Sequence, residues 1–317
     1  MIDASNDTLS PAISWRKLNN FGLIDCYLDS VSHMPVTLSA FDHLQIKSRG
    51  QVTHGNEIPC QNDRLSPATV VTTHQFCDVY YHWVFDIIPR VINSIAELGE
   101  FSNVLLPKPR LRFQTEWLEI AVAKGNWSYI SDTRSYIPGP VYIPSSSTTG
   151  TVVSPWAVSL IKSLGFKIQP SKNTPRIYIR RQGNVHRKIG NETELERALK
   201  SKGFIVIDAA SISVREQIAL FKGAEIVVSA HGSALTNLVF CQPQTSVIEI
   251  FGPYCEETCY PRIAHQVQMR HIGILANELF YFNPLDRFRH AFGAQSAPFH
   301  FKVDPDLVLN SLSILGH

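Results

Sequence analysis

The chain has 317 residues. This is longer than a typical domain with a single hydrophobic core, so two domains are expected. Apolar residues make up 44% of the chain and charged residues 18%, which is ordinary for a soluble globular protein. The net charge of +2 provides no broad basic surface for nucleic acid, and without a run of 18 apolar residues no segment is expected to cross a membrane.

The first residues lack a positively charged stretch followed by an apolar one, so no signal peptide is predicted. Six cysteines, at positions 26, 60, 77, 241, 255 and 259, show no spacing typical of a metal site, and we expect reduced, mostly buried thiols. These features predict a cytoplasmic protein with at most peripheral association with the inner face of the membrane.

Residues 1 to about 68 contain short β-like runs between polar turns, which predicts a β-rich lead-in. Strands are then expected at 69–73, 101–107 and 141–143, and helices at 78–98 and 114–124. The Ser/Thr/Gly run at 145–150 is typical of a linker, so the N-terminal domain is expected to comprise residues 1–150.

The helix predicted at 78–98 carries polar residues on an otherwise apolar element. Pro89 is expected to kink this helix or to start a new one. His82, Asp86 and Arg90 are four residues apart and therefore share one face, which is either a solvated face or a functional one. At this spacing His82 and Asp86 can form a hydrogen bond.

The second half of the chain alternates between strands and helices. Strands are expected at 176–180, 204–207, 224–229 and 246–251, and helices at 155–164, 191–202, 213–221 and after residue 232. Asn191 and Glu194 have the spacing of a capping box. The alternation predicts an α/β class and a Rossmann-like domain over residues 151–290, with a last helix at 307–315.

Several polar residues follow the ends of these predicted strands, where open parallel sheets bind their ligands. They are Arg180, Arg181, His231, Gly232, Ser233, Thr236 and Asn237. Arginines and the N–H groups at the start of a helix suit a phosphate. Glu249 lies in an apolar strand and needs a partner, which a ribose diol, a uracil edge or a backbone cluster would provide.

Two segments resemble the motifs of a known family. YYHWVFDIIPR, residues 80–90, is similar to the N-terminal motif of the family 61 glycosyltransferases, the DUF563 group, and HGSALTN, residues 231–237, followed by VIEIF resembles their second signature. The family includes capsular-polysaccharide enzymes and eukaryotic transferases of xylose and N-acetylglucosamine. The resemblance implies two Rossmann-like domains facing a cleft, the GT-B type, with residues 291–317 packing back on the first domain.

The resemblance also implies a reaction, the inverting transfer of a sugar from a nucleotide-sugar, expected to be a UDP-sugar, to a glycan or lipid-linked glycan acceptor in polysaccharide or capsule synthesis. We expect no metal and no other cofactor, with Arg181 binding the phosphates and Arg180 either adding a second cation or being exposed. Asp86 is the expected base, and His82 is the alternative or its orienting partner.

The remaining expectations concern the acceptor and a competing function. Tyr81 is expected to contact the acceptor, and Arg90 is expected either to do so or to be structural. The alternative is a nucleotide-sugar or glycan-binding protein that has lost the reaction, because Arg180, Ser233 and Ala234 depart from the family pattern. The absence of a G-x-G-x-x-G turn argues against a dehydrogenase.

Overall fold

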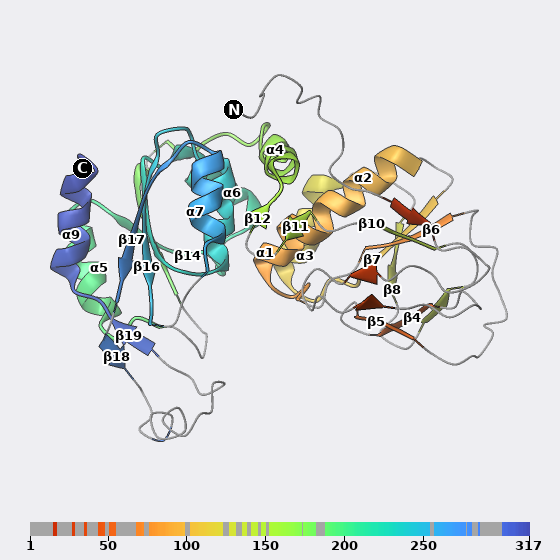
Figure 1. Cartoon of the computed structure of the whole chain (residues 1–317). Helices are drawn as coiled ribbons and strands as arrows, with labels where there is room; N and C mark the ends of the chain where they lie inside the picture. The colour runs from red at the N-terminus through yellow and green to blue at the C-terminus, as the bar shows by residue number, and fades with distance from the viewer. Residues whose placement is uncertain are drawn as a thin grey trace, which may run out of the picture. The chain divides into compact units, whose positions relative to one another are not determined.

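The computed structural model describes residues 15–17, 27–28, 35–36, 44–47, 51–54, 68–72, 76–98, 102–122, 127–130, 135–137, 141–144, 147–149, 152–172, 174–181, 188–253, 257–276, 278–280, 285 and 300–317. The chain divides into two compact units, Met1–Leu164 and Gly165–His317, called unit 1 and unit 2 below (Figure 1). The boundary follows Leu164 rather than residue 150, because helix α4 (Pro155–Leu164) packs on helices of unit 1.

Unit 1 is built on a largely parallel sheet. In spatial order its strands are β1 (Trp15–Lys17), β10 (Val141–Pro144), β6 (Ala68–Val71), β7 (Ser102–Pro107) and β8 (Trp127–Ile130). All neighbouring pairs are parallel except β1 with β10. The smaller sheets contain β2 (Tyr27–Leu28), β3 (Pro35–Val36), β4 (Leu44–Lys47), β5 (Gln51–His54) and β9 (Ser135–Ile137), and their first four strands confirm the β-rich lead-in.

The helix predicted at 78–98 has three parts. They are α1 (Tyr80–His82), the π-helix η1 (Trp83–Ile87) and α2 (Ile88–Leu98), which packs on β7 and on α3 (Arg112–Ala121). Pro89 has no N–H, so it cannot donate an α-helical hydrogen bond to the carbonyl of Phe85. The hydroxyl of Ser147 donates to that carbonyl instead. Pro89 thus lies where the wide π-helical turn gives way to α2, in the first turn of the new helix.

The segment expected to be a linker belongs to the interior of unit 1. Strands β11 (Thr148–Thr149) and β12 (Val152–Val153) pair as an antiparallel hairpin, and the backbone N–H of Ser154 donates to the carbonyl of Ser147 over 2.9 Å. The side chains of Ser147 and Thr148 are buried. The linker prediction is therefore wrong for the described residues of 145–150, because their hydroxyl groups have buried partners on η1.

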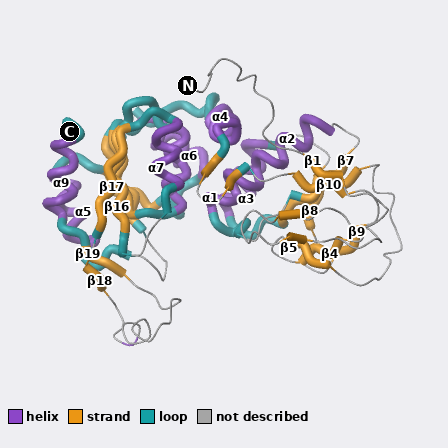
Figure 2. Tube along the Cα trace, viewed as in Figure 1, coloured by secondary structure: helices purple, strands orange, loops and turns teal. Residues whose placement is uncertain are grey.

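Unit 2 contains a fully parallel five-stranded sheet. Figure 2 colours its strands orange. Its spatial order is β14 (Ile205–Asp208), β13 (Arg176–Arg180), β15 (Ile226–Ala230), β16 (Ser246–Phe251) and β17 (Arg270–Leu275). Four of these strands match the predicted ones, and β17 adds a fifth. Every residue of β15 is buried, as its continuous apolar run predicts for a central parallel strand.

Helices cover both faces of this sheet (Figure 1). On one face lie α5 (Glu192–Ser201) and α9 (Pro305–Ile314), and on the other lie α6 (Val214–Gly223), the 3-10 helix η3 (Ser233–Phe240) and α7 (Cys259–Gln266). Buried side chains of α5 and α9, such as Leu195 and Leu312, join alternate strand residues in one core. A small hairpin of β18 (Glu278–Phe280) and β19 (His300–Lys302) completes the unit.

Two further expectations concern unit 2, and the one for Asn191 is wrong. Helix α9 packs on α5, β16 and β17 of its own unit, and the packing of residues 291–317 on the first domain stays a prediction. Asn191 precedes α5 without capping it, because its side chain bonds both backbone groups of Val303, with Nδ2 2.8 Å from the carbonyl oxygen and Oδ1 3.1 Å from the amide nitrogen. Asn191 thereby joins the start of α5 to the segment before α9.

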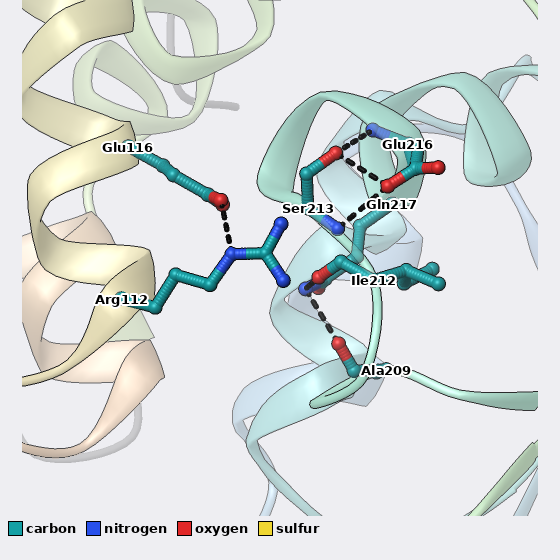
Figure 3. A network of polar contacts seen from close by, with 7 residues as sticks. All are labelled: Arg112, Glu116, Ala209, Ile212, Ser213, Glu216 and Gln217. Carbon is teal, nitrogen blue, oxygen red and sulfur yellow. Dashed lines mark hydrogen bonds and ion pairs between the residues drawn. The ribbon is translucent and has the colours of Figure 1, made fainter.

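The capping box of unit 2 lies instead at α6 (Figure 3). The Ser213 hydroxyl accepts from the amide of Glu216 over 3.2 Å, and the Glu216 carboxylate accepts from the amide of Ser213 over 2.8 Å. Among the described residues, no helix has the length and apolar character needed to cross a membrane.

Candidate functional site

The carboxyl edge of the unit 2 sheet brings Arg181 against the turn that follows β15. Arg181 Nη1 donates to the backbone carbonyl of His231 over 2.5 Å. A Cβ atom at Gly232 would lie 2.8 Å from the same Nη1, so the close approach of the guanidinium requires glycine there. The arrangement confirms that the residue after β13 and the turn after β15 meet, although they are 50 positions apart.

Arg181 is also fixed through its backbone. The carboxylate of Glu192, at the start of α5, accepts from the amide of Arg181 over 3.1 Å and from the hydroxyl of Tyr178 over 2.9 Å. Burial, followed by the negative charge of Glu192, raises the pKa of Tyr178 well above its usual value, so this hydroxyl stays a hydrogen-bond donor. Glu192 therefore supports the arginine from behind the sheet edge.

Glu249 is partnered by two histidines. Its Oε1 lies 2.6 Å from Nδ1 of His231, and its Oε2 lies 2.8 Å from Nε2 of His271 on β17. The Glu249 carboxylate is fully buried, and the His231 ring stacks on Phe251 with centroids 5.5 Å apart. Glu249 therefore has two imidazole partners within the protein, and its contact with a ribose or a uracil edge stays a prediction.

The other polar residues of the HGSALTN segment lie on η3. Ser233 begins this helix and is partly exposed, whereas Thr236 and Asn237 are buried. Asn237 Nδ2 donates to the side-chain oxygen of Gln217 on α6 over 2.8 Å. Thr236 and Asn237 therefore pack η3 into unit 2, and their burial does not favour direct contact with a ligand at this sheet edge.

Arg180 is separated from Arg181. Successive strand residues point to opposite faces of a sheet, and Arg180 Nε lies 3.4 Å from the Glu196 carboxylate on α5. Arg180 thus belongs to the helix-covered face, and the expectation that it adds a second cation for the phosphates is not supported by this contact.

In unit 1 the predicted hydrogen bond between His82 and Asp86 is present. His82 Nδ1 lies 2.8 Å from Oδ2 of Asp86, and the Thr148 hydroxyl donates to Oδ1 over 2.5 Å. Asp86 is fully buried, while 23% of the His82 side chain is exposed. Of the two residues expected as the base, His82 is therefore partly exposed, whereas Asp86 is covered.

The two residues expected to bind the acceptor are buried in unit 1. Tyr81 packs edge to face against Phe85 and His82, with ring centroids 5.4 and 5.1 Å away. Arg90 is 1% exposed on α2, and its backbone carbonyl accepts from the Ser94 hydroxyl. Their burial favours a role in supporting the His82 turn over direct contact with an acceptor.

The described residues contain no group of three or more His, Cys, Asp and Glu side chains arranged to hold a metal ion. The sequence does contain one Asp-x-Asp spacing, at Asp304-Pro305-Asp306. Asp304 caps α9 there, accepting from the amide of Asp306 over 2.9 Å. This pair of carboxylates therefore has a structural explanation.

The sequence does not predict five residues that contact the expected site residues or their neighbours: His271, Thr148, Ser147, Glu192 and Gln217. His271 lies after Pro261, where the strand pattern weakens, and Thr148 lies in a run whose composition is typical of a linker. No local pattern marks either residue, since their partners are 22 and 62 positions away.

Comparison with known proteins shows the family of this chain. The model of the family described as glycosyltransferase 61 matches residues 80–248, more than half of the chain. Beta-1,2-xylosyltransferase RCN11 of Oryza sativa subsp. japonica is 30% identical over 103 residues, which is 30% of this chain and 19% of the relative.

Two further relatives have similar matches. The EGF domain-specific O-linked N-acetylglucosamine transferases of Pan troglodytes and Mus musculus are each 30% identical over 101 residues, again 30% of this chain. Each match covers 19% of the relative's own length, so the similarity concerns a part of those proteins.

Proposed function

Because the chain belongs to the glycosyltransferase 61 family, we propose that it transfers a sugar from a nucleotide-sugar, a UDP-sugar, to a hydroxyl group of a glycan acceptor. The observation that carries this proposal is the Arg181 guanidinium held against His231 and Gly232 at the carboxyl edge of a parallel sheet. That is the place where such sheets bind nucleotides.

The residues at this sheet edge suit a diphosphate leaving group, and we call them the donor-side cluster: Arg181, His231, Gly232, Glu249 and His271. Arginine offers a planar, permanently charged set of donors to phosphate oxygens, and the first N–H groups of η3 beside Gly232 add partial positive charge. Charge that grows on the leaving diphosphate is stabilised by donors already in place. We therefore propose that Arg181 and the Gly232 turn neutralise the leaving group without a metal ion.

Unit 1 provides the group that activates the acceptor. In the proposed step, His82 takes the proton of the acceptor hydroxyl while the acceptor oxygen attacks the anomeric carbon. The bond from that carbon to the diphosphate breaks, and its electron pair leaves with UDP. A single displacement of this kind inverts the anomeric centre and needs one base.

The proposed fold is of the GT-B type, with unit 1 contributing the acceptor side and unit 2 the donor side. This proposal is supported by the presence of a parallel sheet in each unit.

The donor site can be tested by thermal unfolding with UDP, GDP and CMP, each with and without EDTA. A ligand at about 100 times its dissociation constant stabilises the folded state by roughly 2.7 kcal/mol, which raises Tm by a few degrees. We expect UDP to give this shift in the presence of EDTA and Arg181→Ala to abolish it. Arg180→Ala is the matched control and should keep the shift, because Arg180 pairs with Glu196.

The result also separates a transferase from an inactive binding protein. A shift with UDP together with release of free UDP from UDP-sugars in the presence of acceptor supports the reaction. Binding without turnover for any acceptor would favour the inactive protein, and no shift with any nucleotide would overturn the donor site.

A further inference from the structure

The geometry around His82 points to a residue that acts through it. We propose that Thr148 is a positioning residue for the acceptor-side base, holding Asp86 so that Asp86 can orient His82. This inference deepens the proposed function and rests on it for the identity of the reaction, while the arrangement of the three side chains can be tested independently.

The first step of the argument concerns where Asp86 lies. It belongs to the π-helix η1, which ends where Pro89 enters α2. Because Pro89 cannot donate to the Phe85 carbonyl, that carbonyl takes the Ser147 hydroxyl, and the hairpin that begins at β11 is fixed beside the turn. π-Helical turns inside α-helices are frequent at functional sites, where they shift a side chain out of the regular helical array.

The second step concerns the next residue of the same hairpin. Once Ser147 is bound to Phe85, the Thr148 hydroxyl reaches Asp86 Oδ1 over 2.5 Å, and Thr148 itself is 5% exposed. Ser147 therefore donates to the backbone of the π-helical turn, and Thr148 donates to the Asp86 carboxylate within that turn.

The third step follows from the chemistry of the carboxylate. An ionised Asp86 accepts hydrogen bonds and donates none, so the Thr148 hydroxyl and the His82 Nδ1–H must both be donors. A neutral His82 is then fixed as the Nδ1–H tautomer, and its second ring nitrogen, Nε2, carries the lone pair that a general base needs. Asp86 is fully buried, so it acts on a substrate only through His82.

The aromatic neighbours of His82 complete the positioning. Phe76 and Tyr81 place their ring centroids 5.5 and 5.1 Å from the imidazole, Phe76 tilted and Tyr81 edge-on. These contacts restrict the plane of the ring, whereas the hydrogen bond to Asp86 decides which nitrogen holds the proton. Loss of Thr148 should therefore change proton placement and rate more than it changes folding.

Three variants of the full chain test the inference. Thr148→Val keeps the shape of the side chain and removes its hydroxyl, Thr148→Ser restores the hydroxyl, and Ser147→Ala is the neighbouring control that touches only the backbone of the turn. The measurements are kcat and KM for the acceptor, and nitrogen-15 NMR of the His82 imidazole, assigned with His82→Gln.

We expect Thr148→Val to lower kcat by about 10- to 100-fold with little change in KM, because it weakens one part of a general-base contribution of about 100- to 10,000-fold. The imidazole spectrum should change from the Nδ1–H form to a mixture of tautomers. Thr148→Ser should restore both, and Ser147→Ala should retain the wild-type tautomer.

The inference is overturned if Thr148→Val keeps the wild-type tautomer and kcat, or if Ser147→Ala and Thr148→Val lose activity equally with equal losses of Tm. If the wild-type protein binds no UDP and shows no turnover, the transferase proposal fails. The tautomer of His82 in Thr148→Val then decides the positioning role by itself.

Discussion

Gly232 is constrained by the space beside Arg181 rather than by its backbone conformation. Its φ of 173° is extended, which any residue can adopt, but a methyl group would meet Arg181 Nη1 at 2.8 Å. An arginine terminus can move aside at low cost, so Gly232→Ala should leave Tm nearly unchanged. It should weaken UDP binding by roughly tenfold, the effect of about 1.4 kcal/mol, because the guanidinium loses its place at the His231 carbonyl.

Gly203 provides a control for Gly232→Ala in which stability, rather than UDP affinity, is expected to change. It has a φ of +80° and no crowding around its Cβ position, so Gly203→Ala should lower the free energy of unfolding by about 1 kcal/mol while leaving UDP affinity unchanged. Equal UDP affinity in Gly232→Ala and the wild type would show that the position of Arg181 does not matter for binding.

Burial of Cys259 makes the free energy of unfolding depend on pH in a predictable direction. Burial, followed by the charges of Glu257 and Glu249, raises the pKa of its thiol to about 12. An unfolded thiol titrates near about 8.5, so the folded state binds the extra proton between these values. Its contribution to stability is complete below about pH 8.5 and is lost as the pH rises toward 12.

Urea unfolding of the wild type and of Cys259→Ala from pH 7 to pH 10.5 measures this contribution. The difference between their free energies of unfolding should be constant up to about pH 8.5 and then fall by up to about 1.4 kcal/mol per pH unit. Parallel curves over the whole range would show that the thiol is not preferentially protonated in the folded state.

At the residue scale, the sequence predicts contacts only where spacing or strand ends bring residues together. The His82–Asp86 bond follows from a spacing of four, and the meeting of Arg181 with His231 follows from adjacent strand ends. The partners of Glu249 and Asp86 could not be predicted, because His271 and Thr148 reach them through tertiary folding alone.

At the scale of elements, helix α6 connects the sheet edge to η3. It carries Gln217, whose amide nitrogen donates to the Ala209 carbonyl over 2.8 Å and whose oxygen accepts from Asn237 (the bond to Ala209 is shown in Figure 3). The capping box of Ser213 and Glu216 fixes the first turn of α6. The stability of this cap therefore contributes to the position of the whole helix.

Ser213→Ala should lower the free energy of unfolding by about 1 kcal/mol, because the backbone N–H of Glu216 in the first turn of α6 loses its acceptor, the Ser213 hydroxyl. Ser201→Ala is a suitable comparison, since its exposed hydroxyl bonds only the carbonyl of Ala198 at the end of α5, and it should change stability by less than about 0.5 kcal/mol. Denaturant unfolding measures both, and equal values for the two variants would contradict the importance of the cap.

Regular elements of unit 2 were predictable because their apolar patterns match their burial, as in β15 and β16. Three features of unit 2 could not be predicted. The segment Ser233–Phe240 forms a 3-10 helix, where periodicity indicates only a helix, and β17 is exposed at several positions and lacks a continuous apolar run. The third is that Asn191 bonds Val303 rather than capping α5. Each difference depends on packing that a local pattern does not contain.

At the scale of the whole molecule, the chain forms two units with separate sheets, and residues 151–164 belong to the first. Composition and length predict two domains, but the boundary depends on whether a polar segment packs or links. Here the segment packs, because the hydroxyl groups of Ser147 and Thr148 are buried against η1. Helix α4, which follows it, also packs on η1 and belongs to unit 1.

The division into two units predicts which strands should exchange their amide hydrogens more slowly when a nucleotide binds. All members of the donor-side cluster belong to unit 2. Arg181 follows β13, His231 and Gly232 follow β15, and Glu249 and His271 lie on β16 and β17. UDP should therefore slow amide hydrogen exchange at the carboxyl ends of these strands and in η3, because a ligand that binds the folded state suppresses the local opening of its site. The sheet of unit 1 should exchange at its unliganded rate, since no donor-side residue lies in it.

Hydrogen exchange followed by mass spectrometry resolves the two sheets in the full chain, and Arg181→Ala should remove the protection in unit 2 without altering unit 1. Protection that spreads equally over β6, β7 and β8 would mean that UDP binding also stabilises unit 1, and the donor site would then not be confined to unit 2. Protection in unit 2 that persists in Arg181→Ala would place the phosphates elsewhere on the same sheet edge.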